Sequence, residues 1–219
     1  MVIIETIARK IADRIALQLD YDEDKKSVIT YGLIGLLQIL SLFIIIFIIG
    51  SLFGFLYESI VIYVGVCFIR KSTGGAHSRS MNGCNIVSLV SIIIMSALSH
   101  YVLNFPLNQW SNLGITIFVF FVCHIVFYIK VPMDNPNKPI VKPEKIKRLR
   151  RQSFIKLGIL LLISIALVLL AATYNRFYSI ISSIRMIILW LILTLSRPGI
   201  WMLNKFDSCI DNIMRKSND

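Results

Sequence analysis

Acidic residues, prolines and paired cysteines are all scarce in this sequence. The 219 residues include 12 Asp and Glu against 23 Lys and Arg, 6 prolines and 4 cysteines. The cysteines share no repeated spacing: Cys67, Cys84, Cys123 and Cys209. Their spacing does not indicate a disulfide framework, and without four clustered ligands around Cys84 it does not indicate a zinc site. No cofactor and no metal is therefore expected.

Long apolar runs dominate what is present. Hydrophobic residues make up 56% of the chain, against about 45 to 50% in a typical soluble domain, and the mean hydropathy is +0.75. The formal net charge of +11 would suggest nucleic-acid binding only if the basic residues lined a soluble surface. Here they lie between apolar runs, where they act as membrane topology signals. The lipid bilayer is therefore an expected partner, and no nucleic acid is expected.

Six apolar segments have about the 20 residues that cross a bilayer core of about 30 Å. They are 29–50, 52–69, 85–103, 112–129, 155–174 and 180–202. A tight turn near Gly50 and Ser51 separates the first two, because the alternative of one long tilted helix would overshoot the membrane. The sequence thus predicts an all-α polytopic membrane protein with about six transmembrane helices, in a single integral-membrane domain over residues 1–219.

The distribution of Lys and Arg predicts the orientation of these spans. Arg176 and Arg185 are the basic residues expected on the outer side, and Arg197 falls within the last span. The remaining basic residues lie in four segments: 1–28, 70–84, 130–156 and 204–219. Because basic loops stay in the cytoplasm, both termini and the polar loop between the second and third spans are predicted to be cytoplasmic.

The N-terminal segment, residues 1–28, has the pattern of a membrane-surface helix. A stripe of aliphatic residues runs along one face, with charged residues elsewhere; the stripe consists of Ile4, Ile7, Ile11, Ile15 and Leu19. An amphipathic helix of this kind lies in the membrane interface with its apolar face in the lipid. We expect it to anchor the chain to the inner leaflet rather than to bind substrate.

A polar, glycine-rich stretch, GGAHSRSMNGC from Gly74 to Cys84, interrupts the apolar runs. It places His77 seven residues before Cys84. Three cations lie in or next to the same stretch: Arg70, Lys71 and Arg79. A cysteine attacks a carbonyl as the thiolate, which neighbouring cations, a protonated histidine and a helix N-terminus all favour. Cys84 is expected to have all three, with His77 as the base and later the acid.

The spacing of this pair requires a bend in the chain. Seven residues of unbroken helix would separate the Cα atoms of His77 and Cys84 by about 10 Å, which is too far for a hydrogen bond. The segment must therefore fold back, and Gly74 and Gly75 supply the conformational freedom. From the spacing alone, a plain connecting loop without catalysis remains the other interpretation.

The residues just before Cys84 are predicted to form a turn. Asn82 and Gly83 are typical of turns, so Cys84 is expected to start the helix of the third span. Ser80 and Asn82 are candidate oxyanion or orienting donors, although residues of this type also serve simply to complete turns.

Two longer stretches make the sequence recognisable. IRKSTGGAHSRSMNGC, from Ile69 to Cys84, is followed by VPMDNPNKPI, from Val131 to Ile140. In this order the motifs resemble those of the accessory gene regulator protein B (AgrB) family, the integral-membrane cysteine endopeptidases of peptide quorum sensing in Gram-positive bacteria. The resemblance covers nearly the whole chain, and the long tail after the sixth span departs from it. It implies a multi-pass protein of the bacterial cell membrane with a cytoplasmic active site.

The resemblance also implies a substrate and a reaction. The substrate is a short ribosomal propeptide with an amphipathic leader, a central signal sequence and an acidic C-terminal tail. Cys84, assisted by His77, is expected to cleave the bond before the tail and to form a thioester. An internal cysteine or serine of the peptide then displaces Cys84 and closes a thiolactone or lactone ring, while water is kept out. Family members self-associate, so a homodimer is expected as well.

Supporting roles are expected around this centre and in the basic 130–156 segment. That segment carries nine cations and is expected to hold the acidic tail, although such residues also fix topology and bind anionic lipid. The residues expected to bind or support are Arg70, Lys71, Gly75, Arg79, Ser80, Asn82 and Lys138. Glu58, an acidic residue within a span, is expected to pair with Arg185.

A non-catalytic transporter or exporter of a small peptide is the alternative function. Six spans with a basic cytoplasmic face fit that class equally well when the motifs are ignored. Transporters, however, place polar residues near several helix midpoints or break matched helices in their two halves. The sequence shows neither pattern, so the peptidase hypothesis is preferred.

Overall fold

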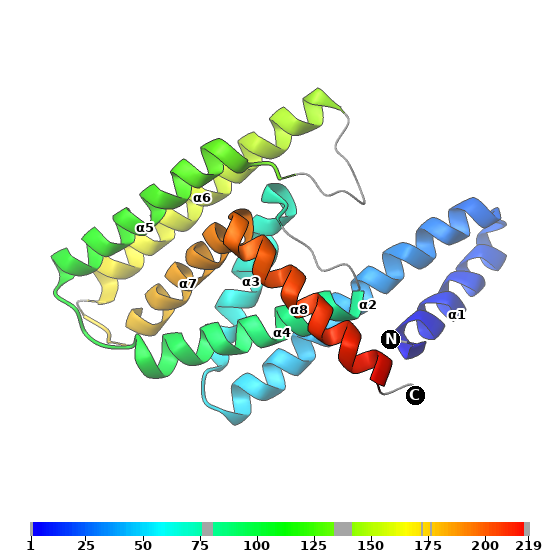
Figure 1. The fold of residues 1–219 in the computed structure, drawn as a ribbon, viewed down its shortest axis with the longest axis horizontal. Helices are drawn as coiled ribbons and strands as arrows, with labels where there is room; N and C mark the ends of the chain where they lie inside the picture. The colour runs from blue at the N-terminus through cyan, green and yellow to red at the C-terminus, as the bar shows by residue number, and fades with distance from the viewer. Residues whose placement is uncertain (1, 76–80, 134–141, 172, 176, 217–219) are drawn as a thin grey trace. The chain divides into compact units, whose positions relative to one another are not determined.

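The computed structural model describes residues 2–75, 81–133, 142–171, 173–175 and 177–216 (Figure 1). The elements within these residues are helices: α1 (Val2–Leu19), α2 (Glu23–Leu52), α3 (Leu56–Thr73), α4 (Met81–Ala97), the π-helix η1 (Leu98–Val102), α5 (Gln109–Lys130), α6 (Pro143–Ala171), α7 (Phe177–Leu195) and α8 (Arg197–Lys216). The chain forms two compact units, Met1–Ile48 and Ile49–Asp219. For the part that is described, the all-α prediction is confirmed.

The first unit contains α1 and most of α2. α1 is the helix predicted for the N-terminal segment, and small side chains on it, at Ala8 and Ala12, are fully buried. Ile7, on the predicted aliphatic stripe, keeps 43% of its surface exposed. An ion pair of 2.8 Å between Asp13 Oδ1 and Lys26 Nζ joins α1 to the start of α2. The alanines thus let α1 pack closely within the unit, while part of the aliphatic stripe stays accessible to lipid.

α2 and α3 are two separate helices, so the single long helix weighed as an alternative does not form. The turn between them is predicted near Gly50 but lies around Gly54, whose φ of +78° suits glycine. α3 then starts so close to the end of α2 that a Cβ atom on Gly50 would lie 3.0 Å from the Cα atom of Leu56. Gly50 therefore allows the two helices to approach closely, whereas the turn itself lies around Gly54.

Five stretches of helix in the described chain are long and apolar enough to cross a membrane: α2, residues Gly83–Val102 of α4 and η1, α5, α6 and α7. α3 corresponds to the second predicted span, 52–69, and is not among these five, because its 18 residues include three charged side chains, Glu58, Arg70 and Lys71. The two cations lie in its last turn, beyond the end of the predicted 52–69 segment. The helices fit a multi-pass membrane protein, whereas the count of six and the orientation stay predictions.

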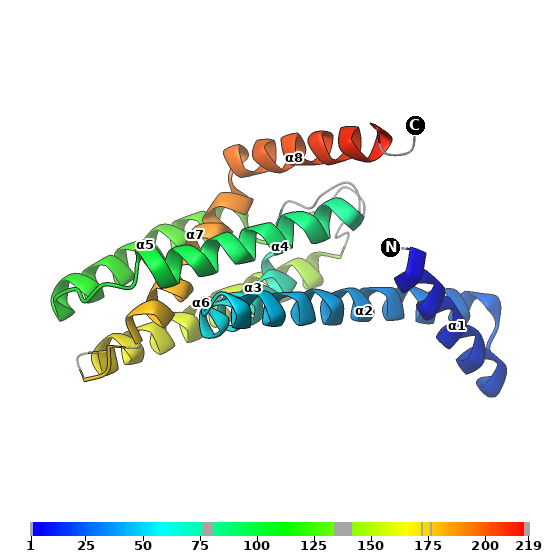
Figure 2. The same ribbon diagram turned by 90° about the horizontal axis from the view of Figure 1, so that it is seen from below.

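α7 lies at the centre of the second unit. It contacts α3, α5 and α6, and α4, η1 and α8 also touch it (Figures 1 and 2). Its buried residues include hydroxyl side chains and a set of aliphatic residues at helical spacing: Ile181, Ile184, Ile188, Leu191 and Leu195. Gly65 of α3 lets Ile187 approach, because a Cβ atom on that glycine would collide with the isoleucine side chain. α7 therefore ties the helices of the bundle to one another.

α6 begins at Pro143, well before the predicted start of the fifth span at residue 155. Proline is favoured in the first turn of a helix, because it has no N–H to leave unpaired and its φ is already helical. Five basic residues that were expected in a loop therefore lie on the first turns of a helix: Lys145, Lys147, Arg148, Arg150 and Arg151. The last part of the basic 130–156 segment is thus helical, while 134–141 lies outside the described residues.

The last predicted span, 180–202, is interrupted. α7 ends at Leu195, the chain bends at Ser196, and α8 follows. Pro198 has no N–H with which to continue the hydrogen bonding of α7. The Ser196 hydroxyl instead accepts a hydrogen bond of 3.3 Å from the Gly199 N–H, as a helix-capping residue does. The apolar pattern alone overlooked this break, because the residues after Pro198 are apolar too.

α8 occupies the segment that the sequence suggested to be a tail, residues 204–219, as far as Lys216. It contacts both α7 and α4. Gly199 packs so closely against the Leu193 carbonyl that a Cβ atom would collide with it. The helix is therefore held against the end of α7 at its first turn.

Candidate functional site

The structure describes part of the predicted site. Cys84, Arg70, Lys71 and Gly75 are described with their surroundings, whereas only the backbone is described for Asn82. Four predicted residues lie outside the described residues: His77, Arg79, Ser80 and Lys138. The contact between His77 and Cys84, on which the peptidase hypothesis depends, therefore stays a prediction.

Cys84 lies in the first turn of α4, and its side chain is partly exposed. The helix already includes Asn82 and Gly83, so the turn predicted for these two residues does not form. The first turn of a helix has N–H groups without intrahelical partners, and polar or small residues are well tolerated there. The predicted placement at a helix start holds for Cys84, and the helix dipole favours an anion at this position.

The Arg70 guanidinium lies close enough to Cys84 for an electrostatic interaction with its thiolate. Arg70 belongs to the last turn of α3, and it interacts in the same way with Cys67, which precedes it on that helix. The guanidinium therefore adds positive charge beside the first turn of α4. Lys71, the next residue, is exposed and adds positive charge at the surface.

A short backbone pairing joins the two sequence motifs. Gly74 forms a parallel bridge with Met133, and the Met133 N–H donates a hydrogen bond of 2.9 Å to the Thr73 carbonyl. Gly74 has φ +69° and ψ −144°, a region open mainly to glycine, and a Cβ atom there would collide with the Met133 carbonyl. The stretch that leads to His77 is thus fixed against the stretch that follows α5.

Gly75 extends this arrangement to the end of α7. It is buried with a φ of +131°, and a Cβ atom on it would lie 3.8 Å from Thr194 Oγ1 and 3.9 Å from Arg70 Nε. Thr194 is buried, and its hydroxyl donates a hydrogen bond of 3.2 Å to the Leu191 carbonyl. Sequence reasoning missed Thr194 and Met133, because only the packing of α5 and α7 brings them to the loop.

Basic side chains from α3 and α6 gather at this end of the second unit. Lys156 Nζ donates a hydrogen bond of 2.6 Å to the Phe68 carbonyl and lies 5.0 Å from the centre of the Phe68 ring. Its ammonium group is close enough to that of Lys71 for the two to repel. Arg150 donates from Nη2 to the Tyr128 carbonyl over 2.7 Å. Such an electropositive surface attracts anionic groups of a peptide or of a lipid.

The opposite end of α3 holds a buried carboxylate. Glu58 is 3% exposed, and its Oε1 lies 3.0 Å from His100 Nδ1 of η1. The expected pair between Glu58 and Arg185 is therefore wrong. The π-helical turn places the His100 ring beside α3, within reach of the carboxylate, whereas Arg185 points to another helix.

Arg185 of α7 finds its partners on α5. Its Nη2 donates to the Asn112 carbonyl over 2.7 Å and to Thr116 Oγ1 over 2.7 Å, and it also contacts Asn112 Oδ1. Its Nε donates to the same threonine hydroxyl over 3.2 Å. A buried polar group costs stability unless it is hydrogen-bonded, and these neutral acceptors satisfy the guanidinium. The buried Glu58 and the partly buried Arg185 thus each link neighbouring helices at this end.

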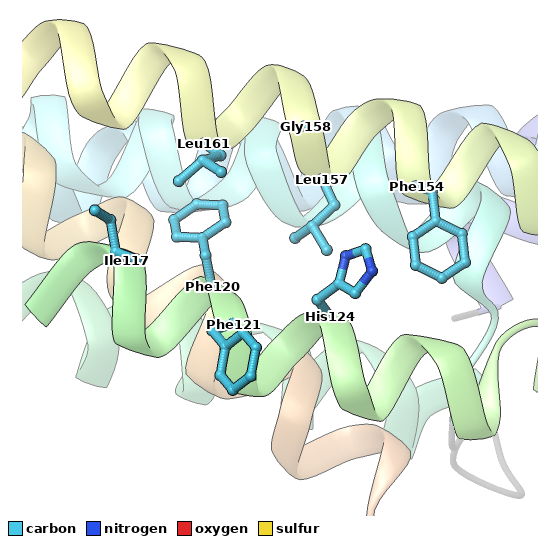
Figure 3. Close-up of a pocket in the computed structure, with 8 residues that line it drawn as sticks. All are labelled: Ile117, Phe120, Phe121, His124, Phe154, Leu157, Gly158 and Leu161. Carbon is cyan, nitrogen blue, oxygen red and sulfur yellow. The ribbon is translucent and has the colours of Figure 1, made fainter. Parts of the chain in front are cut away.

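A separate cavity of 330 Å³ lies between α5 and α6 (Figure 3). His124 of α5 points into it from one side, and the ring of Phe154 on α6 lies 4.9 Å from the histidine ring, centre to centre. The other lining residues are apolar, and Cys84 is not among them. In the described part of the chain, no three His, Cys, Asp or Glu side chains lie close enough together to hold a metal ion.

Comparisons with known proteins can be set against this geometry. The accessory gene regulator B family model matches residues 8–195. An AgrB-like protein of Clostridium perfringens (strain SM101) is 32% identical over 217 residues, which cover 96% of this chain and 100% of the relative. AgrB-like protein 2 of another C. perfringens strain is 31% identical over 219 residues, with the same coverage. An AgrB-like protein of Listeria innocua is 26% identical over 148 residues, 68% of each chain.

No solved structure matches the chain. The family match includes α2 to α7, and with them Cys84, Arg70 and the Gly74–Met133 pairing, whereas α8 lies beyond it. The two C. perfringens relatives align over nearly the whole chain. On this match and this identity, the chain belongs to the accessory gene regulator B (AgrB) family.

Proposed function

We propose that this chain is a membrane cysteine endopeptidase that removes the C-terminal tail of a short ribosomal propeptide. The observation that carries the proposal is the placement of Cys84 in the first turn of α4, with the Arg70 guanidinium near enough for an electrostatic interaction. A helix start and a cation both stabilise a thiolate, which is the form of cysteine that attacks a carbonyl. Membership of the AgrB family supports a role in peptide processing.

His77 completes the proposed chemistry. The Gly74–Met133 pairing fixes the chain close to its position in the sequence, because the described backbone reaches Gly75, two residues before His77. The Cys84 sulfur adds to the carbonyl carbon of the scissile bond, and the carbon–nitrogen bond then breaks. The proton held by His77 passes to the departing amine of the tail, which leaves a thioester on Cys84.

An internal thiol or hydroxyl of the peptide then attacks the thioester carbonyl. The carbon–sulfur bond to Cys84 breaks, the thiolactone or lactone ring closes, and the attacking group's proton returns through His77 to the site. Exchange of one thioester for another is nearly neutral in free energy, whereas hydrolysis would end the reaction without a ring. Water therefore has to be excluded, for which a centre at the end of a helix bundle is suited.

The electropositive end of the second unit fits the acidic tail of such a substrate. Arg70 and Lys71 of α3 and Lys156 of α6 lie there, and five further cations follow Pro143 on α6. By the positive-inside rule we place this end, both termini and the reaction in the cytoplasm of a bacterial cell. We further propose that the chain acts as a homodimer in the membrane.

The proposal is tested by replacing the sulfur. Cys84→Ala should abolish cleavage of a co-expressed, tagged cognate propeptide on a gel, while the protein still inserts into the membrane. Cys67→Ala is the matched control, because Cys67 also interacts with Arg70 but is not the proposed nucleophile. Continued cleavage by Cys84→Ala would remove the enzyme assignment.

A further inference from the structure

An apolar cavity lies between α4, α7 and α8, in the part of the chain where the family match ends. α8 contacts both other helices, and its ribbon crosses that of α4 in Figure 1. The cavity has a volume of 110 Å³, with walls that include Val87 and Val90 of α4, Trp190 of α7, and Met202 and Phe206 of α8. α8 therefore closes a groove that α4 and α7 alone would leave open.

The size of this groove limits its occupant. Pockets that bury a whole drug-sized ligand measure about 300 to 1,000 Å³, whereas one water occupies about 30 Å³ in the liquid. A volume of 110 Å³ therefore suits one side chain rather than a whole peptide. The lining is apolar except for the hydroxyl of Ser91 and the indole N–H of Trp190, so the side chain should be apolar as well.

The position of the groove connects it to the reactive sulfur. Val87 follows Cys84 by three residues on α4, which is about 4.5 Å along the helix axis. Residues three and seven positions after Cys84 lie on nearly the same helical face as the sulfur, and these are Val87 and Ser91 of the cavity wall. The groove thus begins one helical turn from Cys84, on nearly the same face of α4.

The two surroundings of Cys84 have opposite character. The Arg70 guanidinium from α3 lies close enough to interact with Cys84, whereas the groove wall that begins one turn further along α4 is apolar. The segment that leaves in the proposed reaction is acidic and is drawn to the cations. The segment that stays on sulfur as the acyl group then faces the apolar groove.

We propose that this groove binds the apolar side chain of the substrate residue whose carbonyl Cys84 attacks, so that α8 helps to select the cleavage site. The inference rests on the proposed function and deepens it. Two contacts keep the wall in place: the capping of Gly199 by Ser196, and the close packing of Gly199 on the Leu193 carbonyl. Phe206 is 49% exposed and Val90 43%, so the groove is open to an incoming side chain.

The experiment compares two thiol-reactive probes on the purified full chain in detergent. Acetyl-leucine chloromethyl ketone and acetyl-glycine chloromethyl ketone each alkylate a thiol with loss of chloride, and they differ only in the side chain beside the carbonyl. Mass spectrometry of the Cys84 peptide gives the labelling rate with each probe. The leucine probe should label about tenfold faster, which is at the low end of what hydrophobic pockets discriminate. Iodoacetamide, which has no such side chain, reports the reactivity of the thiol itself.

Three variants locate the preference. Val90→Phe fills the groove and Phe206→Ala removes its α8 wall, so both should bring the ratio of the two rates close to one. Trp201→Ala is the matched control on α8, because Trp201 is 61% exposed and does not line the cavity, and it should keep the ratio. Equal iodoacetamide labelling in all of them shows that Cys84 itself is unchanged.

The outcomes separate this inference from the peptidase proposal. Equal labelling by both probes in a wild-type chain that processes propeptide would overturn only the proposal that the groove binds a substrate side chain. Lipid would then be the occupant of the groove. An unchanged ratio in both Val90→Phe and Phe206→Ala would overturn it as well. A clear preference in a chain that never processes propeptide would overturn the endopeptidase and, with it, the role of the groove in cleavage, although it would show that an apolar side chain binds beside Cys84.

Discussion

The two ends of α3 are about 18 Å apart along the helix axis, from Glu58 in the first turn to Arg70 in the last, and they are built differently. At the Glu58 end, side chains link one helix to the next. Glu58 pairs with His100, and Ser182 Oγ of α7 donates a hydrogen bond of 3.0 Å to the Leu103 carbonyl after η1. At the Arg70 end, a backbone pairing between Gly74 and Met133 joins the end of α3 to the chain after α5, and Arg70 itself lies close enough to interact with the Cys84 thiol.

The two ends therefore differ in what their polar groups do: those at the Glu58 end hold helices together, whereas those at the Arg70 end surround a candidate reactive group. Hydrogen bonds between helices satisfy buried polar groups and fix the helices, which is what a membrane bundle requires. Backbone conformations that only glycine adopts readily are costly and tend to occur at functional sites, where the surrounding structure holds them. The Glu58 end is therefore interpreted as a clamp, and the Arg70 end as the reaction site.

The largest expected effect at the Arg70 end comes from His77. His77→Gln should reduce propeptide processing by about 10²- to 10⁴-fold, the usual contribution of a general acid–base group, while the peptide still binds. Alkylation of Cys84 by iodoacetamide at neutral pH should also slow, if the imidazolium stabilises the thiolate. If processing is lost but the alkylation rate is unchanged, Arg70 rather than His77 stabilises the thiolate. His77 would then act only as the acid that protonates the departing amine.

Gly74→Ala should damage the same end through the backbone. Its φ and ψ disfavour alanine by about 1 to 3 kcal/mol, and the added Cβ atom collides with the Met133 carbonyl. Processing should fall more than the thermal stability in detergent, because the distortion lies at the end of α3 that holds Arg70. Gly114→Ala on α5 is the matched control, since a Cβ atom there meets nothing within 4 Å. A Gly74 variant with normal processing would mean that the pairing with Met133 is dispensable for the site.

Arg185→Leu tests the clamp. It leaves Asn112 and Thr116 without their donor, and interhelical hydrogen bonds in membranes are worth about 1 kcal/mol, so the Tm in detergent should fall modestly. Labelling of Cys84 by iodoacetamide should be unchanged, because Arg185 has no described contact with the site. Slower labelling at an unchanged Tm would contradict the division of the bundle into a clamp and a reaction site.

The smallest effects per residue are expected from the basic first turns of α6. Exposed ion pairs contribute about 0 to 1 kcal/mol each, so only joint neutralisation should weaken substrate capture and flatten its salt dependence. The residues to change together are Lys145, Lys147, Arg148, Arg150 and Arg151. Span orientation and Cys84 alkylation are the controls, because these cations also set topology. Unaltered apparent affinity across a range of salt would make this segment a membrane anchor only.

Much of the helical organisation could be predicted from local sequence. Apolar runs of about 20 residues have few alternatives to a helix in lipid, so five stretches of spanning length appear where the hydropathy places them. Errors arose at boundaries, where local signals compete: Pro143 starts α6 early, and Pro198 ends α7 before the apolar pattern does. The polar, cationic setting of Cys84 was also readable from the sequence, because its causes lie within fifteen residues of it.

The sequence by itself therefore determined most of the helices, the candidate cysteine and the excess of positive charge. Only the tertiary structure decided which side chains meet: Glu58 with His100 rather than Arg185, Gly74 with Met133, and Gly75 with Thr194. The same holds for α8, whose place beside α4 creates the groove near Cys84. A helix forms from interactions within about four residues, whereas these contacts depend on which helices pack against each other and at what rotation, and no local pattern encodes that choice.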